Sequence, residues 1–103
     1  MFITKKTQQK LINFVKDRGF EKFHTEENIA KAISSESGEL LKNYLWGEGW
    51  PVDEENKKDE IADILIFCFY YLQEMSWDAD ELINLKILKN INKYPKPENK
   101  PVI

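Results

Sequence analysis

The segment ILIFCFYYL, residues 64–72, constrains the fold more than any other stretch of this chain, because every residue in it is apolar or aromatic. It is about half as long as a membrane-spanning helix, and the surrounding pattern has the length and period of a helix rather than the alternation of a strand. A helix that is apolar on all sides is stable in water only when it is enclosed on all sides. One chain of 103 residues has few other helices with which to enclose it. We therefore expect a second copy of the chain to cover part of this segment.

Glycine and proline residues divide the chain into helical segments. Gly19 ends the first segment, the loop GEGWPV separates the second from the third, and Pro95 stops the fourth. The expected fold class is all-α, a subunit of the four-helix bundle type, with helices over 4–18, 26–46, 53–74 and from 78 or 80 to 94. We expect one domain over residues 1–94 and an extended, Pro-rich tail over residues 95–103.

Charge and composition exclude several classes of protein. The formal net charge is -3 with a pI near 5.2, and the chain has no block of basic residues, so we expect neither nucleic acid nor an anionic membrane as a partner. The single cysteine, Cys68, cannot form an internal disulfide and is typical of a reducing compartment. The first residues, MFITKKTQQK, lack the apolar core of a signal peptide. These features favour a soluble cytoplasmic protein.

Four carboxylates lie on the apolar sides of the two central helices. Glu36 falls in the middle of the apolar stripe of the second helix, and Glu39 lies on the edge of that stripe, one turn away. In the third helix, Glu60 shares a face with apolar residues, and Asp63 follows three positions later. The pattern is Glu-x-x-Glu, a gap of 20 residues, then Glu-x-x-Asp. On a helical hairpin, both pairs can reach one common point.

Carboxylates that converge in a partly desolvated site repel one another and destabilise the fold unless they are protonated or neutralised. A divalent cation would neutralise them. All the candidate ligands are oxygens, and the chain has only one histidine and one cysteine, so Mg²⁺, or Mn²⁺ in its place, fits better than zinc. Mg²⁺ held by carboxylates keeps positions open for water and for substrate phosphates.

Two other classes of function share parts of this pattern. A di-metal carboxylate oxidase requires Glu-x-x-His pairs, and the single histidine excludes it. A helical interaction module without catalytic activity is an alternative, in which residues 64–72 form a dimerisation face and the four carboxylates are surface charges.

The fourth helix carries a polar stripe of Lys86, Asn90 and Lys93, which are spaced i, i+4 and i+7. Beside a metal site this stripe could hold phosphate oxygens, with lysine as the charge and asparagine as a donor. By itself, such a stripe is more often an ordinary solvated helix face.

These residues resemble the signature of the MazG-like all-α nucleoside triphosphate pyrophosphohydrolases, and most closely that of the dCTP pyrophosphatase branch. The resemblance rests on the two carboxylate pairs and on three segments that together span residues 17–95, namely DRGFEKFHTEENIAKAISSESGELLKNYLW, DEIADILIFCFYYL and LKNINKYP. It implies a helical bundle whose subunits pair as a homodimer or, in many members, as a homotetramer made of two dimers. It also implies Mg²⁺-dependent hydrolysis of an NTP or dNTP to the monophosphate and pyrophosphate.

The resemblance also implies roles for individual residues. These roles are metal binding by Glu36, Glu39, Glu60 and Asp63, phosphate binding by Lys86 and Asn90 with Lys93 on the same stripe, and base contact by Phe20, Trp46 and Phe67. On spacing alone, Phe20 and Trp46 are more typical of core residues than of a stacking surface.

Three positions depart from the vertebrate members of that branch. Leu11 stands where they have a histidine, Phe20 where they have a tryptophan, and Phe67 where they have a tyrosine. Fewer polar groups are then available to read a base, and the nearest candidates are His24 and Asn28. The resemblance therefore implies a preference for dCTP or a related pyrimidine deoxynucleotide that is broader than in the vertebrate enzymes.

The expected reaction is attack of water at the α-phosphorus, with a carboxylate as the general base. We favour Glu39 over Glu36 as this base, because Glu36 is the more enclosed of the two and is better suited to hold the metal. His24 directly precedes the expected N-cap Thr25, where a structural role is favoured over that of a base.

Overall fold

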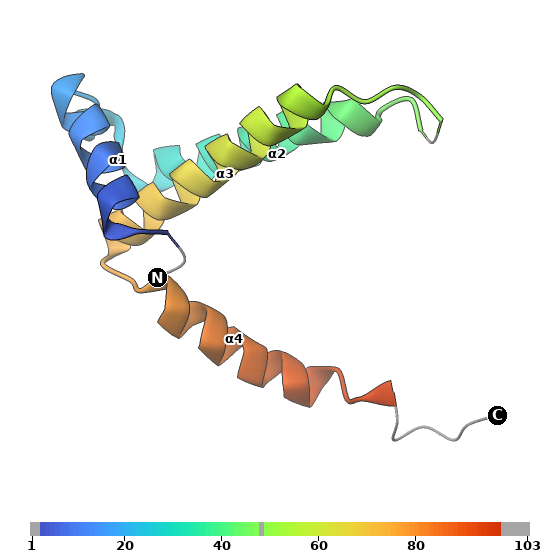
Figure 1. Cartoon of the computed structure of the whole chain (residues 1–103). Coiled ribbons are helices and arrows are strands. Elements are labelled where there is room, and N and C mark those ends of the chain that lie inside the picture. The colour runs from blue at the N-terminus through green and yellow to red at the C-terminus, as the bar shows by residue number, and fades with distance from the viewer. Residues whose placement is uncertain (1–2, 48, 98–103) are drawn as a thin grey trace.

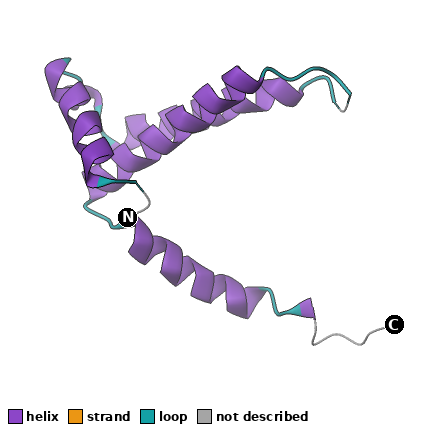
Figure 2. Ribbon diagram, in the orientation of Figure 1, coloured by secondary structure: helices purple, strands orange, loops and turns teal. Residues whose placement is uncertain are grey.

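The structure is a computed structural model that describes residues 3–47 and 49–97. Within these ranges every regular element is a helix and no strand is present (Figure 2). The elements in chain order are α1 (Lys5–Asp17), the 3-10 turn η1 (Glu21–Phe23), α2 (Glu26–Leu41), the 3-10 turn η2 (Lys42–Tyr44), α3 (Glu54–Met75) and α4 (Ala79–Lys93). The predicted all-α class and the four predicted helices are therefore confirmed. Residues 98–103 of the expected tail lie outside the described residues.

Each of the four α-helices begins at a side chain that caps it. Thr4, Thr25, Asp53 and Asp78 each accept a hydrogen bond from the backbone N–H three residues later. Such a bond satisfies one of the donors that the first turn of a helix leaves free. The helix starts are therefore encoded locally, by the residue type at one position.

The end of α2 differs from the sequence-based expectation. The second helix was predicted to reach the neighbourhood of Trp46, but it is α-helical only to Leu41 and then tightens into η2. The side-chain amide of Asn43 donates a hydrogen bond of 3.1 Å to the carbonyl oxygen of Leu40. A side chain that binds the backbone in this way competes with the regular helical bond and favours a helix end.

The two long helices, α2 and α3, run antiparallel and pack side by side along their length, as Figure 1 shows. At the end where α2 begins and α3 finishes, α1 lies across this hairpin. The chain then turns at Ser76, which has a left-handed backbone (φ 57°), and α4 diverges from the hairpin. The described residues of one chain therefore form an elongated body of 61 × 38 × 26 Å and do not close into a four-helix bundle by themselves.

The buried core sits where α1, α2 and α3 meet. It consists of Val15, Ile29, Phe69 and Tyr70, one side chain from each of the first two helices and two from the third. The hydroxyl of Tyr70 donates a hydrogen bond of 3.1 Å to the carbonyl oxygen of Leu11 in α1. This contact satisfies a polar group inside an otherwise apolar cluster and joins α3 to α1.

Much of the apolar surface is not covered within one chain. Of residues 64–72, only Phe69 and Tyr70 are buried, and Leu65 is 44% exposed. The apolar side chains of α4 are also exposed, among them Leu85, Leu88 and Ile91. Among the described helices, none combines the length and the apolar character that a membrane crossing requires.

Candidate metal centre and the adjoining cavity

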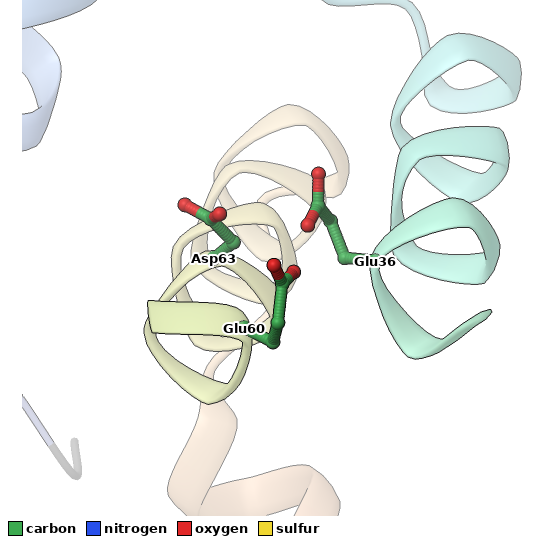
Figure 3. A group of neighbouring side chains, drawn as sticks. All are labelled: Glu36, Glu60 and Asp63. Atoms are coloured by element: carbon green, nitrogen blue, oxygen red, sulfur yellow. The ribbon is translucent and has the colours of Figure 1, made fainter. Parts of the chain in front are cut away.

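Three carboxylates meet between the two helices of the hairpin. Glu36 of α2 and Glu60 and Asp63 of α3 each offer one carboxylate oxygen, and these three oxygens lie within 4.8 Å of one another. Figure 3 shows the three side chains facing a common point from the two helices. The antiparallel packing of α2 on α3 thus brings together three of the four carboxylates that the sequence pattern had paired.

The electrostatic consequence is greatest at Glu36, whose pKa is raised to about 7 from a usual value of 4.5. The main cause is the neighbouring carboxylate of Glu60, which accepts a hydrogen bond from the protonated form of Glu36. Desolvation and the negative charges of Asp63, Glu60 and Glu39 act in the same direction. In the absence of a cation, Glu36 therefore keeps its proton up to about pH 7.

The chemistry of the donor set fits a divalent cation. When the carboxylates are ionised, Oε2 of Glu60 is buried and has no hydrogen-bond donor among the described residues. A buried, unpartnered carboxylate oxygen is costly, and a cation is the partner that removes the cost. Three oxygen ligands without histidine or cysteine suit Mg²⁺ or Mn²⁺.

Glu39 does not belong to this group of three. Its carboxylate pairs with the ammonium of Lys42 at 3.0 Å, and its side chain is 46% exposed. It lies close enough for its charge to act on Glu36, but its oxygen is outside the cluster that the other three form. Its assignments as a metal ligand and as the general base stay predictions.

Two asparagines behind Glu60 were not singled out from the sequence. Asn56 lies one turn before Glu60 on α3 and donates to Glu60 Oε1 at 3.5 Å. Asn43 of η2 donates in turn to Asn56 Oδ1 at 3.0 Å. The i, i+4 spacing of Asn56 and Glu60 was visible in the sequence, but the contact from Asn43 depends on how the hairpin packs.

A cavity of about 620 Å³ opens beside the cluster, and Asp63 contributes to both. Four of the five residues predicted to contact a nucleobase line it, namely Phe20, His24, Asn28 and Phe67. Leu11, one of the positions where the resemblance predicted a lost polar group, also lines the cavity. The structure therefore gathers these residues, which come from α1, the connection around η1, α2 and α3, around one space.

The cavity is more aromatic than the sequence analysis anticipated. Phe14, Phe23 and Tyr70 also line it, and so does the amine-bearing side chain of Lys10. Phe14 packs edge-on against Phe20, with ring centroids 6.2 Å apart. Lys10 and Phe14 are four residues apart on α1 and therefore lie on the same face of that helix, which lines the cavity. The sequence analysis missed this spacing because α1 has no polar motif of its own.

The polar groups in this cavity are held in definite orientations. The side-chain amide of Asn28 donates to the carbonyl oxygen of Phe23 at 3.1 Å, so its Oδ1 is the atom left to accept a hydrogen bond. The ring of His24 packs on that of Tyr70, with centroids 4.7 Å apart. These contacts favour the predicted structural role of His24.

Four of the predicted site residues are not brought to this place within one chain. Trp46 does not line the cavity; it follows η2 in the loop that connects α2 to α3, where its ring lies 6.1 Å from that of Trp50. Lys86, Asn90 and Lys93 are carried on α4, which diverges from the hairpin (Figure 1). Their predicted contacts with base and phosphates would need another copy of the chain.

Comparison with known proteins gives one consistent result. Residues 31–102 match the MazG-like family. The dCTP pyrophosphatase 1 proteins of Mus musculus and Homo sapiens are 27% and 29% identical to this chain over 90 residues, which are 80% of this chain and 53% of each relative. A crystal structure of a pyrophosphatase from Archaeoglobus fulgidus DSM 4304 is similar with a TM-score of 0.79 and 33% identity, over 89% of this chain and 92% of that one.

The chain spans about half the length of the curated relatives it matches. The family match covers more than half of the chain and includes both carboxylate pairs, from Glu36 to Asp63. Sequence, fold and site geometry agree with this match, and the chain belongs to the MazG-like family.

Proposed function

We propose that this chain is a divalent-metal-dependent nucleotide pyrophosphohydrolase that converts a (d)NTP to the monophosphate and pyrophosphate. The observation that carries the proposal is the position of Asp63, which belongs to the three-carboxylate cluster and also lines the aromatic cavity. A nucleotide whose base occupies the cavity would place its phosphates toward the carboxylates. The names of the relatives support the proposal, since those proteins are a pyrophosphatase and dCTP pyrophosphatases.

In this proposal Glu36, Glu60 and Asp63 hold the cation, with Mg²⁺ first and Mn²⁺ as a substitute. A cation bound there supplies charge neutralisation at the α-phosphoryl group and lowers the pKa of water. Glu39, one turn along α2 from Glu36, takes the proton from the attacking water. The water oxygen bonds to the α-phosphorus, the bond from that phosphorus to the bridging oxygen breaks, and pyrophosphate leaves.

The base is held chiefly by stacking on the aromatic walls, which include Phe20 and Phe67. Stacking supports every base, whereas discrimination requires hydrogen bonds. Few polar side chains line the cavity, and Asn28 offers an acceptor oxygen that suits an amino group on the base. We propose dCTP or a related pyrimidine deoxynucleotide as the preferred substrate, with moderate selectivity.

The proposal includes a homodimer or homotetramer. Its support is the exposed apolar surface of α3 and α4, exemplified by Leu65 and Leu88. A second copy would cover this surface and could bring its own Lys86 and Asn90 to the phosphates.

One experiment tests the reaction. The metal-free protein is incubated with each canonical dNTP in ¹⁸O-labelled water, with and without Mg²⁺, and the products are followed by phosphorus NMR and mass spectrometry. We expect pyrophosphate and a monophosphate that carries the label, only in the presence of the cation. Orthophosphate with a diphosphate, or label in the pyrophosphate, contradicts attack at the α-phosphorus. The absence of any hydrolysis would favour the alternative, a non-catalytic helical interaction module.

A further inference from the structure

Asn56 donates a hydrogen bond to the carboxylate of Glu60, and Asn43 donates one to Asn56. We propose that this pair of asparagines makes the cluster select Mg²⁺ over Ca²⁺. The inference rests on the proposed function, because it takes the three carboxylates to be a metal site. It concerns Asn43 and Asn56, which bias the oxygen through which Glu60 binds a cation.

The direction of each hydrogen bond in the pair follows from the chemistry of the amide. Nδ2 of Asn43 donates both to the carbonyl oxygen of Leu40, at 3.1 Å, and to Oδ1 of Asn56, at 3.0 Å. An amide has one acceptor oxygen and one donor nitrogen. Since Oδ1 of Asn56 already faces Asn43, its Nδ2 must face the other way, toward Glu60. The orientation of Asn56 is therefore set by a residue on the opposite arm of the hairpin.

The two oxygens of Glu60 are consequently not equivalent. Oε1 accepts from Nδ2 of Asn56 at 3.5 Å, while Oε2, when the carboxylates are ionised, is buried without a donor among the described residues. The bond to Oε1 is long and therefore weak, so it contributes direction more than energy. It engages one lone pair of Oε1 and so biases Glu60 toward binding a cation through Oε2 alone.

The number of available oxygens matters because the two cations differ in what they require. Mg²⁺ needs nearly octahedral geometry, keeps several waters and binds through only a few carboxylate oxygens. Ca²⁺ takes more oxygen ligands in a looser geometry and commonly uses both oxygens of one carboxylate. A Glu60 that is biased toward binding through Oε2 alone suits Mg²⁺ and disfavours the coordination through both oxygens that Ca²⁺ commonly uses.

The test measures cation binding rather than catalysis. Mg²⁺ and Ca²⁺ are titrated separately into the metal-free full chain by calorimetry, for the wild type, Asn56→Leu and a matched control, Asn84→Leu. Asn84, like Asn56, donates a hydrogen bond to a residue four positions away, but it lies on α4. In Asn56→Leu we expect Mg²⁺ affinity to fall about tenfold, as is typical when a partner of a metal ligand is removed. Ca²⁺ affinity should stay the same or rise, and both affinities should be unchanged in the control.

A second variant tests whether Asn43 acts on Glu60 through Asn56. Asn43→Leu should lower the ratio of Mg²⁺ to Ca²⁺ affinity in the same direction but less than Asn56→Leu does, because it acts only through the orientation of Asn56. The double variant should show no larger effect than Asn56→Leu alone. Equal loss for both cations would indicate a merely structural role for the asparagines and would overturn the proposal.

The outcomes separate this inference from the proposed function. If the wild type binds Mg²⁺ and the affinity ratio stays within about twofold in the variants, the selectivity role is wrong and the metal site stands. If the wild type binds neither cation, the metal site is wrong and the inference falls with it. If circular dichroism shows that Asn56→Leu is unfolded, an unchanged ratio of Mg²⁺ to Ca²⁺ affinity in the folded Asn43→Leu protein overturns the proposal.

Discussion

The hydroxyl of Tyr70 donates a hydrogen bond of 3.1 Å to the carbonyl oxygen of Leu11, which joins the buried end of α3 to α1 across 59 positions of the sequence. The same Tyr70 ring lines the aromatic cavity and packs against His24. One contact thus holds α1 in the position from which its residues can form a wall of the cavity.

Replacing this tyrosine should destabilise the protein measurably. Tyr70→Phe removes the hydrogen bond that joins α3 to α1, so we expect a loss of about 1 kcal/mol in the free energy of unfolding. Urea unfolding followed by circular dichroism gives this value. Tyr71→Phe, at the neighbouring half-buried position, is the control. Equal losses in the two variants would mean that the contact with Leu11 contributes nothing specific.

The raised pKa of Glu36 predicts how stability depends on pH in the metal-free protein. The pKa is about 7 in the folded chain against 4.5 for the free group, so between these values the folded state binds more protons than the unfolded state. The contribution of Glu36 to stability is therefore present at low pH and is lost as the pH rises through about 7. The difference between wild type and Glu36→Gln in urea unfolding, measured from pH 4 to about pH 8, isolates this contribution. A difference that does not change with pH would contradict the shift.

The role of Asp63 predicts a separation of activity from stability. Asp63→Asn should reduce Mg²⁺-dependent pyrophosphate release by at least about 100-fold, since it removes a proposed metal ligand rather than a partner of one. The metal-free variant should be as stable as the wild type or more stable, because one of three repelling charges is gone. Asp59→Asn, an exposed carboxylate on the same helix, is the control and should keep full activity. Wild-type turnover in Asp63→Asn would refute the assignment.

The uncovered apolar surface predicts self-association. Leu65 and Leu88 are 44% and 60% exposed within one chain, on α3 and α4 respectively. We expect light scattering to show a dimer or tetramer at micromolar concentration, and Leu88→Glu to shift the protein toward smaller species. A wild-type protein that is monomeric under these conditions would show that the surface is not an interface between copies.

Stacking in the cavity predicts a change in affinity without a change in preference. Phe67→Ala should raise KM for all four canonical dNTPs by a similar factor, about 5- to 150-fold, because a flat ring supports every base. The order of kcat/KM among the substrates should be unchanged in this variant. A wild-type preference for dCTP above about 10³-fold would show that polar readout dominates. A purine as the best substrate would contradict the proposed preference for a pyrimidine.

Trp46 provides a companion measurement, because it does not line this cavity within one chain. If Trp46→Ala raises KM as Phe67→Ala does, Trp46 contacts the base, as the family resemblance implies, and it does so from another copy of the chain. An unchanged KM would mean that the predicted base contact of Trp46 is wrong.

The sequence by itself determined the helices and the three carboxylates that meet in the candidate metal cluster. Capping residues such as Thr25 and Asp53 mark helix starts through hydrogen bonds that span only three residues, so the local sequence is sufficient to predict them. Glu36 and Glu60 could be assigned to apolar helix faces from the helical period alone. Two helices with carboxylates on facing sides, joined by a short loop, already imply that the charges meet.

The tertiary structure alone decided which residues complete the site. The partner of Asn56 lies on the other arm of the hairpin, and the wall formed by Phe14 and Phe20 depends on where α1 crosses that hairpin. Such contacts follow from how helices pack, which depends on side-chain shape over the whole interface rather than on local spacing. For the same reason the sequence predicted a bundle, whereas one chain leaves α4 and its Lys86 apart from the carboxylates. The apolar pattern shows that a helix face must be buried, but it does not specify which chain covers it.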